Sequence, residues 1–134
     1  MIELTIPGEC VPKGRPRFTR TGRAYTPAKT KNYEALVKHY AYQLDVAPLT
    51  GALKVELIVY KAVPKSYSKI KRANCLKNKH LPQVKPDLDN YIKSVLDALN
   101  GVLFDDDNQI CELVAKKLYG EEPKVELKIE KMEE

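Results

Sequence analysis

Two acid-rich segments in this sequence combine residue types that can do chemistry. The first is Asp87-Leu88-Asp89-Asn90 and the second is Asp105-Asp106-Asp107-Asn108-Gln109. Lys93 and Asp97 lie between them. Carboxylate oxygens are the ligands that hard divalent cations prefer, and a bound cation beside positive surface can act on a phosphodiester. The residue types therefore favour a metal-dependent site for a phosphodiester substrate.

Each acidic segment also has a purely structural interpretation. Asp87 and Asp89 straddle an expected helix start, where an Asp side chain accepts unpaired backbone N–H groups and suits the positive end of the helix dipole. Asp105–Asp107 would suit a solvated turn before a strand. This turn does not fit a calcium-binding EF-hand, because its sixth position is Ile110 rather than Gly. The residues favour the metal site and leave the structural alternative open.

Positive charge is concentrated ahead of the acidic segments. Residues 1–86 carry 17 lysines and arginines against five acids, whereas residues 87–134 carry six against 13. Two stretches contain no acid: residues 10–33 hold seven basic residues and residues 57–86 hold eight. Such blocks are typical of surfaces that contact nucleic acid, although a charged block can also serve only solubility.

Hydrophobic periodicity predicts the elements that must position these residues. Alternation predicts strands over 2–6, 53–60, 109–119 and 124–130, and apolar stripes predict helices over about 26–45 and 88–100. Residues 10–26 have a loop composition, and the basic stretch 61–85 admits a short helix around 67–76. The order β-α-β-α-β-β predicts the α+β class, with a mixed sheet on which the helices pack, in a single domain over 1–134.

A shared site for both acidic segments places a demand on the fold. The helix between them has about 13 residues and is roughly 20 Å long. Asp89, Lys93 and Asp97 share one of its faces, because they follow one another at four-residue spacing. Asp107 lies beyond its far end in the sequence. A single site therefore requires the chain after the helix to bring Asp107 back beside Asp89.

The acidic segments and the helix between them resemble the signature of a known family. The segments Lys85–Lys93 (KPDLDNYIK), Val95–Gly101 (VLDALNG) and Asp106–Ile110 (DDNQI) are similar to those of the RusA-type Holliday junction resolvases, crossover junction endodeoxyribonucleases common in prophages. Pro12–Phe18 (PKGRPRF) with Tyr25–Pro27 is a looser similarity. The resemblance implies a RusA-like fold and a homodimeric, Mg²⁺-dependent enzyme. Such an enzyme resolves four-way DNA junctions by paired symmetric nicks in recombination and repair.

The resemblance also implies residue roles. By position, Asp87, Asp89 and Asp107 match the catalytic, metal-binding aspartates, with Asp106 as the other candidate for the third ligand. Lys93 matches the essential lysine, which would steady charge on a phosphate oxygen or help orient the nucleophile. The residues expected to hold the DNA backbone are Lys13, Arg15, Arg17, Lys69, Lys71 and Arg72.

Several other classes of protein fit the sequence poorly. Cys10, Cys75 and Cys111 form no Cys-x-x-Cys pair, which argues against a disulfide framework or zinc site and favours a cytoplasmic location. No apolar run reaches the roughly 18 residues of a membrane span, and no Gly-rich phosphate loop is present. We therefore expect neither a membrane nor a nucleotide cofactor. The remaining alternatives are a non-catalytic branched-DNA-binding protein and an unrelated Asp-x-Asp enzyme such as a small sugar transferase.

Overall fold

The computed structural model describes residues 1–14, 17–25 and 27–132. The elements are, in chain order, β1 (Ile2–Pro7), β2 (Arg17–Phe18), β3 (Ala24–Tyr25), α1 (Ala28–Tyr42), β4 (Leu53–Ala62), α2 (Lys69–Leu76), α3 (Leu88–Leu99), the 3-10 helix η1 (Asp107–Gln109), β5 (Ile110–Gly120) and β6 (Lys124–Lys131). The predicted α+β class and element order are confirmed. The structure adds η1 and a short β2–β3 hairpin inside the predicted loop, and the short helix that the basic stretch admitted is α2.

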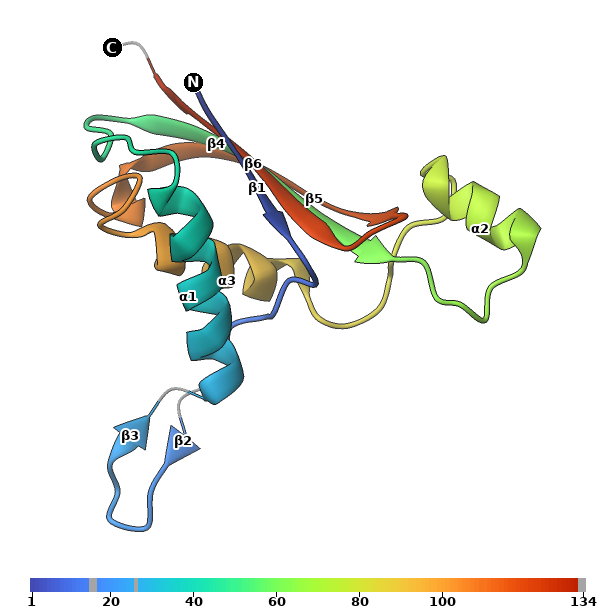
Figure 1. Ribbon diagram of the computed structural model, residues 1–134, viewed down its shortest axis with the longest axis horizontal. Coiled ribbons are helices and arrows are strands. Elements are labelled where there is room, and N and C mark those ends of the chain that lie inside the picture. The colour runs from blue at the N-terminus through green and yellow to red at the C-terminus, as the bar shows by residue number, and fades with distance from the viewer. Residues whose placement is uncertain (15–16, 26, 133–134) are drawn as a thin grey trace.

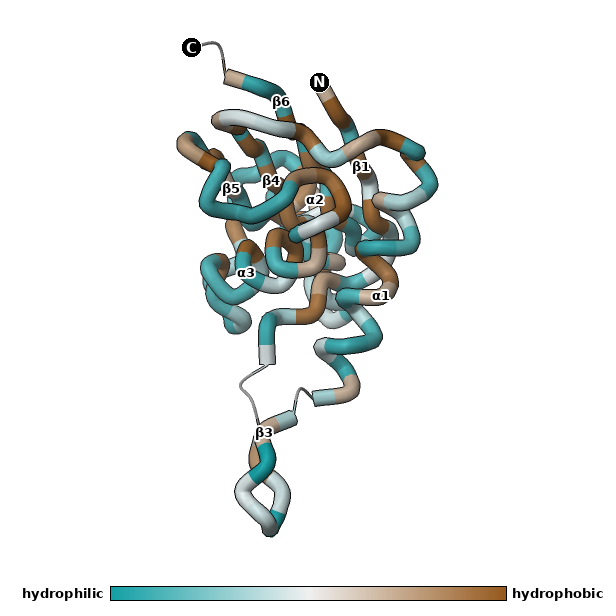
Figure 2. Tube along the Cα trace, turned by 90° about the vertical axis from the view of Figure 1, so that its left-hand side faces the viewer, coloured by the Kyte–Doolittle hydropathy of each residue, from teal (hydrophilic) through white to brown (hydrophobic). Residues whose placement is uncertain are grey.

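A four-stranded mixed sheet in the order β1-β6-β4-β5 forms one layer of the molecule. β4 pairs parallel with β5 and antiparallel with β6, and β6 pairs antiparallel with β1. Helices α1 and α3 cover one face of the sheet, while α2 lies beyond one end of it (Figure 1). β1 and β5 are its two edges, and the β2–β3 hairpin projects away from the layers (Figure 2).

Side-chain alternation decides which face of the sheet is covered. In β4, Val55 and Leu57 are fully buried, whereas the intervening Glu56 is exposed. The same alternation in β6 buries Leu127 and Ile129. The helices supply the other half of the core, chiefly through Tyr33, Val37, Tyr91, Val95 and Leu99. This arrangement sets the orientation of α3, because its apolar stripe must face the sheet.

Helix α3 runs opposite to the two parallel strands that it connects. The chain passes from β4 through α2 and α3 into β5 (Figure 1). Near the end of β5, Lys117 Nζ donates to the Pro86 carbonyl at 3.2 Å, just before α3. Just after α3, Gly101 N–H donates to the Phe104 carbonyl at 2.7 Å, on the way to β5. The start of β5 therefore lies at the C-terminal end of α3, and its end lies at the N-terminal end.

The base of the β2–β3 hairpin is fixed to α1. Gly14 N–H donates to Thr30 Oγ1 at 3.1 Å, and Thr30 is 2% exposed. A Cβ at position 14 would lie 2.7 Å from that oxygen, so only glycine fits without displacement.

Within the described part of the chain, no helix is both long enough and apolar enough to cross a membrane.

Candidate functional site

The predicted catalytic residues at the start of α3 lie on its exposed face. Asp87 occupies the N-cap position, but its side chain makes no capping hydrogen bond. Asp89 and Lys93 are also exposed, whereas Tyr91 and Ser94 are buried against the core. Capping therefore does not occupy the Asp87 carboxylate. Asp87, Asp89 and Lys93 are presented to solvent from a helix that the core holds rigidly.

The second acidic segment is held in place by Gln109. Gln109 Oε1 accepts hydrogen bonds from the backbone N–H groups of Asp105 at 2.8 Å and Asp106 at 3.1 Å. Gln109 Nε2 donates to the carbonyls of Leu49 at 2.9 Å and Gly51 at 3.1 Å. This one side chain thus fixes the acidic turn to the loop ahead of β4. Sequence analysis used Gln109 only as a motif position and did not predict this role.

The carboxylates in this turn repel one another. A side-chain hydrogen bond from Asp106, partial burial and the negative charges of Asp106 and Asp97 together raise the pKa of Asp107. Carboxylate oxygens are the ligands that hard divalent cations prefer, and a bound cation would offset the repulsion between these two neighbouring carboxylates. The chemistry of Asp106 and Asp107 therefore fits a metal ion.

Lys13 bridges α1 and α3 beside these carboxylates. Its Nζ lies 2.7 Å from Glu34 Oε1 and 3.3 Å from Asp97 Oδ2. Its backbone N–H donates to the Asn90 carbonyl at 3.2 Å. Burial lowers the pKa of Lys13, but the hydrogen bonds and charges of the two carboxylates outweigh burial and raise it. The charge expected to face DNA is thus paired inside the protein.

The structure does not bring Asp107 back to the start of α3. Asp107 lies near enough to Asp97 to feel its charge, and Asp97 is eight residues beyond Asp89, about 12 Å along the helix axis. Among the described residues of one chain, no three Asp, Glu, His or Cys side chains converge on a position for a metal ion. The expectation that Asp107 would return beside Asp89 within one chain is wrong. The physical reason is that β5 starts at the far end of α3.

Two lysines from the sheet hold the segment that leads into Asp87. Lys117 Nζ donates to the Val84 and Pro86 carbonyls at 2.8 and 3.2 Å, and Lys61 Nζ lies 3.4 Å from the Lys85 carbonyl. Sequence analysis did not identify these two lysines. One feature of the sequence could have identified Lys117: it occupies a position in β5 where the alternation predicts an apolar side chain on the covered face.

The basic residues of α2 that are predicted to contact DNA belong to a helix that packs on a small hydrophobic core, separate from the main core of the sheet and helices. Val63, Cys75 and Tyr119 are buried together, and the ring of His80 stacks on Tyr119 with centroids 6.0 Å apart. Ser68 Oγ caps α2 by accepting a hydrogen bond from the Lys71 N–H at 3.2 Å. The predicted DNA contacts here are Lys69 and Lys71, which are exposed, and Arg72, which is half-buried.

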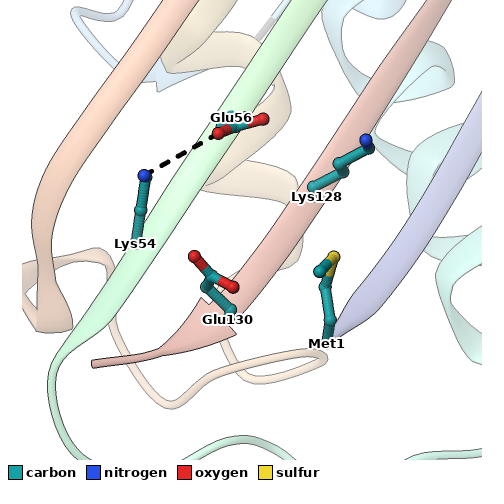
Figure 3. A pocket seen from close by; sticks show the side chains of 5 residues that line it. All are labelled: Met1, Lys54, Glu56, Lys128 and Glu130. Carbon is teal, nitrogen blue, oxygen red and sulfur yellow. Dashed lines mark ion pairs between the residues drawn. The ribbon is translucent and has the colours of Figure 1, made fainter. Parts of the chain in front are cut away.

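The remaining predicted contacts and a hollow on the sheet add no further site. Arg15 lies outside the described residues, and for Arg17 only the backbone in β2 is described. Figure 3 shows a shallow hollow on the open face of the sheet, lined by Met1, Lys54, Glu56, Lys128 and Glu130. Its side chains alternate in charge and include an ion pair of 3.8 Å, so they largely neutralise one another. It lies on the face of the sheet opposite α3.

Comparisons with known proteins identify the family of this chain. Residues 7–130 match the family described as "Endodeoxyribonuclease RusA". The chain is also 40% identical over 134 residues to "Uncharacterized protein YqaN" of Bacillus subtilis (strain 168), and the match covers 96% of this chain and 94% of that protein. The family match includes α3, the acidic turn and the whole of the loop over residues 10–26. This chain belongs to the RusA family of endodeoxyribonucleases.

Proposed function

We propose that this protein is a Mg²⁺-dependent endodeoxyribonuclease that resolves four-way DNA junctions by paired symmetric nicks, in recombination and repair. The observation that carries the proposal is the exposed face of α3, where Asp87, Asp89 and Lys93 are held by a buried stripe and Asp87 makes no capping bond. The whole chain, residues 1–134, would act as one endonuclease domain. A cytoplasmic location remains a prediction that rests on three unpaired cysteines.

Each candidate residue has a defined task in this proposal. Asp87, Asp89 and Asp107 would hold the ion, with Asp106 as the alternative third ligand. Bound Mg²⁺ would supply charge neutralisation at the attacked phosphate and position a water molecule. Lys93 is a turn away from Asp89 on the same face and would bind a phosphate oxygen as charge develops there.

The substrate would be held through its backbone. Lys69 and Lys71 lie exposed on α2, beyond the end of the sheet at which α3 begins (Figure 1). Contacts of this kind are independent of DNA sequence and weaken steeply with salt. We further propose that the protein is a homodimer, because a four-way junction is nearly two-fold symmetric and both symmetric strands must be cut.

The decisive experiment is cleavage of a synthetic four-way junction in Mg²⁺. Asp89→Asn removes one carboxylate charge at nearly constant size and should lower cleavage at least about a hundredfold while leaving junction binding intact. Asp45→Asn is the matched control, because Asp45 is exposed, lies outside the candidate site and has a positive φ that Asn tolerates. Cleavage retained by Asp89→Asn would contradict the proposal.

A second candidate is a branched-DNA-binding protein without cleavage activity. It is favoured by one observation, the distance of Asp107 from the start of α3 within a single chain. This candidate predicts tight binding of four-way junctions and no nicks at any Mg²⁺ concentration. A gel-shift assay and a cleavage assay on the same labelled junction distinguish the two functions.

A further inference from the structure

The loop over residues 81–86 leads into α3 and has little structure of its own. It lies between α2 and α3 (Figure 1), and its residues form neither helix nor strand. Within the described part of the chain, none of its N–H and carbonyl groups bonds to other backbone, and most of its side chains are exposed. A segment with few buried contacts and a solvated backbone opens easily. Other contacts must therefore hold this loop if Asp87, the next residue, is to keep a fixed position.

Lys117 holds the loop from the sheet. Its Nζ donates to the Val84 carbonyl at 2.8 Å and to the carbonyl of Pro86, the residue directly before Asp87, at 3.2 Å. Hydrogen bonds from a charged donor are roughly twice as strong as those between neutral groups. Lys117 is half-buried near the end of β5, in the part of the strand that pairs with β4. Its ammonium group thus connects the approach to Asp87 to a regular strand.

Lys61 connects the same loop to α3 itself. Its Nζ lies 3.4 Å from the Lys85 carbonyl and 3.4 Å from the Tyr91 hydroxyl. Tyr91 is 1% exposed, so the core fixes it, and it lies two residues beyond Asp89 in the first part of α3. Lys61 therefore links the chain before the Asp-x-Asp pair to the helical turn after it. Together, the two lysines bind the carbonyls of residues 84, 85 and 86.

Both lysines occupy positions that packing would give to apolar side chains. Lys117 pairs with Val59, which is 1% exposed on the helix-covered face of the sheet, and Lys61 follows Val59 by two residues in β4. Alternation therefore places all three side chains on the covered face. A cation is also unfavourable here, because the N-terminus of α3 is the positive end of the helix dipole. The two lysines thus have a task besides packing.

We propose that Lys117 and Lys61 are positioning residues for the candidate active site, and that their ammonium groups hold the loop that sets the place of Asp87. This inference rests on the proposed function. Each lysine acts through a backbone carbonyl next to Asp87, so neither has to touch the DNA. Partners that hold a metal-binding side chain from behind typically contribute about 10- to 100-fold to metal affinity or activity.

Hydrogen exchange of the metal-free protein tests this contact without any need for activity. Lys117→Met keeps most of the side-chain length and removes the donor, so the amides of residues 84–92 should exchange about tenfold faster or more, while those of β4 and β6 keep their rates. Lys117→Arg should retain most of the protection, because a guanidinium still offers several N–H donors. Lys128→Met is the matched control, since Lys128 is exposed on the open face of β6. Unchanged exchange of residues 84–92 in Lys117→Met would overturn the proposal.

Junction cleavage tests whether the contact serves the site. Lys117→Met and Lys61→Met should each lower kcat about tenfold or more and raise the Mg²⁺ concentration needed for half-maximal cleavage, whereas KM for the junction stays within about twofold. Lys117→Arg should restore most of kcat, and Lys128→Met should leave both kinetic constants unchanged. If Lys117→Met does not fold, Lys61→Met provides the same comparison.

Two other roles for these lysines predict different results. A lysine that bound a DNA phosphate would lower the magnitude of the slope of log Kd against log salt by about 0.9 on replacement and raise KM. A lysine with a purely structural role would lower the urea midpoint and leave the Mg²⁺ requirement of the folded protein unchanged. Either result would overturn the positioning role. If the wild-type protein itself cuts no junction, the proposed function fails, while hydrogen exchange still decides whether the lysines hold the loop.

Discussion

Lys13 Nζ lies 3.3 Å from Asp97 Oδ2, and this ion pair ties the basic loop to the face of α3 that also carries Asp89 and Lys93. Glu34 of α1 completes the contact at 2.7 Å. The base of the projecting hairpin is therefore attached to both helices of the covered layer. This position gives Lys13 a structural task that its basic sequence context did not suggest.

Replacing Lys13 should change cleavage without changing the salt dependence of DNA binding. Lys13→Met removes the charge that joins α1, α3 and the loop, so we expect lower cleavage and a loss of about 1 kcal/mol in the free energy of unfolding. The slope of log Kd against log salt should stay the same, because the ammonium contacts carboxylates rather than phosphates. Filter binding at several salt concentrations provides the measurement. A shallower slope would show that Lys13 contacts DNA directly.

Substitution of the basic residues on α2 should change the salt dependence of DNA binding without changing stability, the opposite of the Lys13 substitution. The triple change of Lys69, Lys71 and Arg72 to Ala should lower the magnitude of that slope by about two to three, since each phosphate contact contributes about 0.9. The free energy of unfolding should change little, because none of these three side chains is buried. A control triple change on the open sheet face, at Lys54, Lys124 and Lys128, should leave the slope unaltered.

Gly14 should tolerate no side chain. Gly14→Ala would place a Cβ 2.7 Å from Thr30 Oγ1 and disturb the hydrogen bond between the Gly14 N–H and that oxygen. We expect a loss of about 1 to 3 kcal/mol in urea unfolding. The double change Gly14→Ala with Thr30→Ala should recover part of this loss, because it removes the clash while the N–H stays unpaired. No recovery would mean that the clash is not the cause.

Gln109→Glu should damage the acidic turn despite its equal size. A glutamate keeps the oxygen that accepts from Asp105 and Asp106 but loses the N–H groups that donate to Leu49 and Gly51. It also adds negative charge beside an already repulsive cluster. We expect a loss of about 1 to 3 kcal/mol in the free energy of unfolding and a fall in cleavage. High Mg²⁺ should restore part of the cleavage, which can be followed by titration.

Stability should fall at alkaline pH because of Cys10. Burial raises the pKa of this thiol to about 11 from 9.0, and the side chain is 3% exposed. Since the folded-state value is the higher one, the contribution is complete below pH 9 and is lost as the pH rises through 11. It amounts to about 2 to 3 kcal/mol. Urea unfolding between pH 8 and 11 should show the decline, and Cys10→Ala should make it shallower.

Local pattern alone was enough for the element order and for the choice of candidate site residues. Strand alternation and helical stripes are properties of short windows, so β4, β6, α1 and α3 were predictable to within a few residues. The Asp-x-Asp pair, Lys93 and the acidic pair near Gln109 could be singled out because each is a short sequence motif, and such motifs are local properties too. The two-residue strands β2 and β3 could not, because they are too short to show alternation.

The tertiary structure alone decided how these residues meet. Gln109 contacts carbonyls 58 and 60 residues away, and Lys117 contacts backbone 31 and 33 residues away. Such contacts depend on strand order and on the direction of α3, which no short window encodes. The parallel pairing of β4 and β5 placed Asp107 at the far end of α3 from Asp89. The sequence by itself determined which side chains are candidates for the site, and the direction of one helix across the sheet decided which of them one chain can bring together.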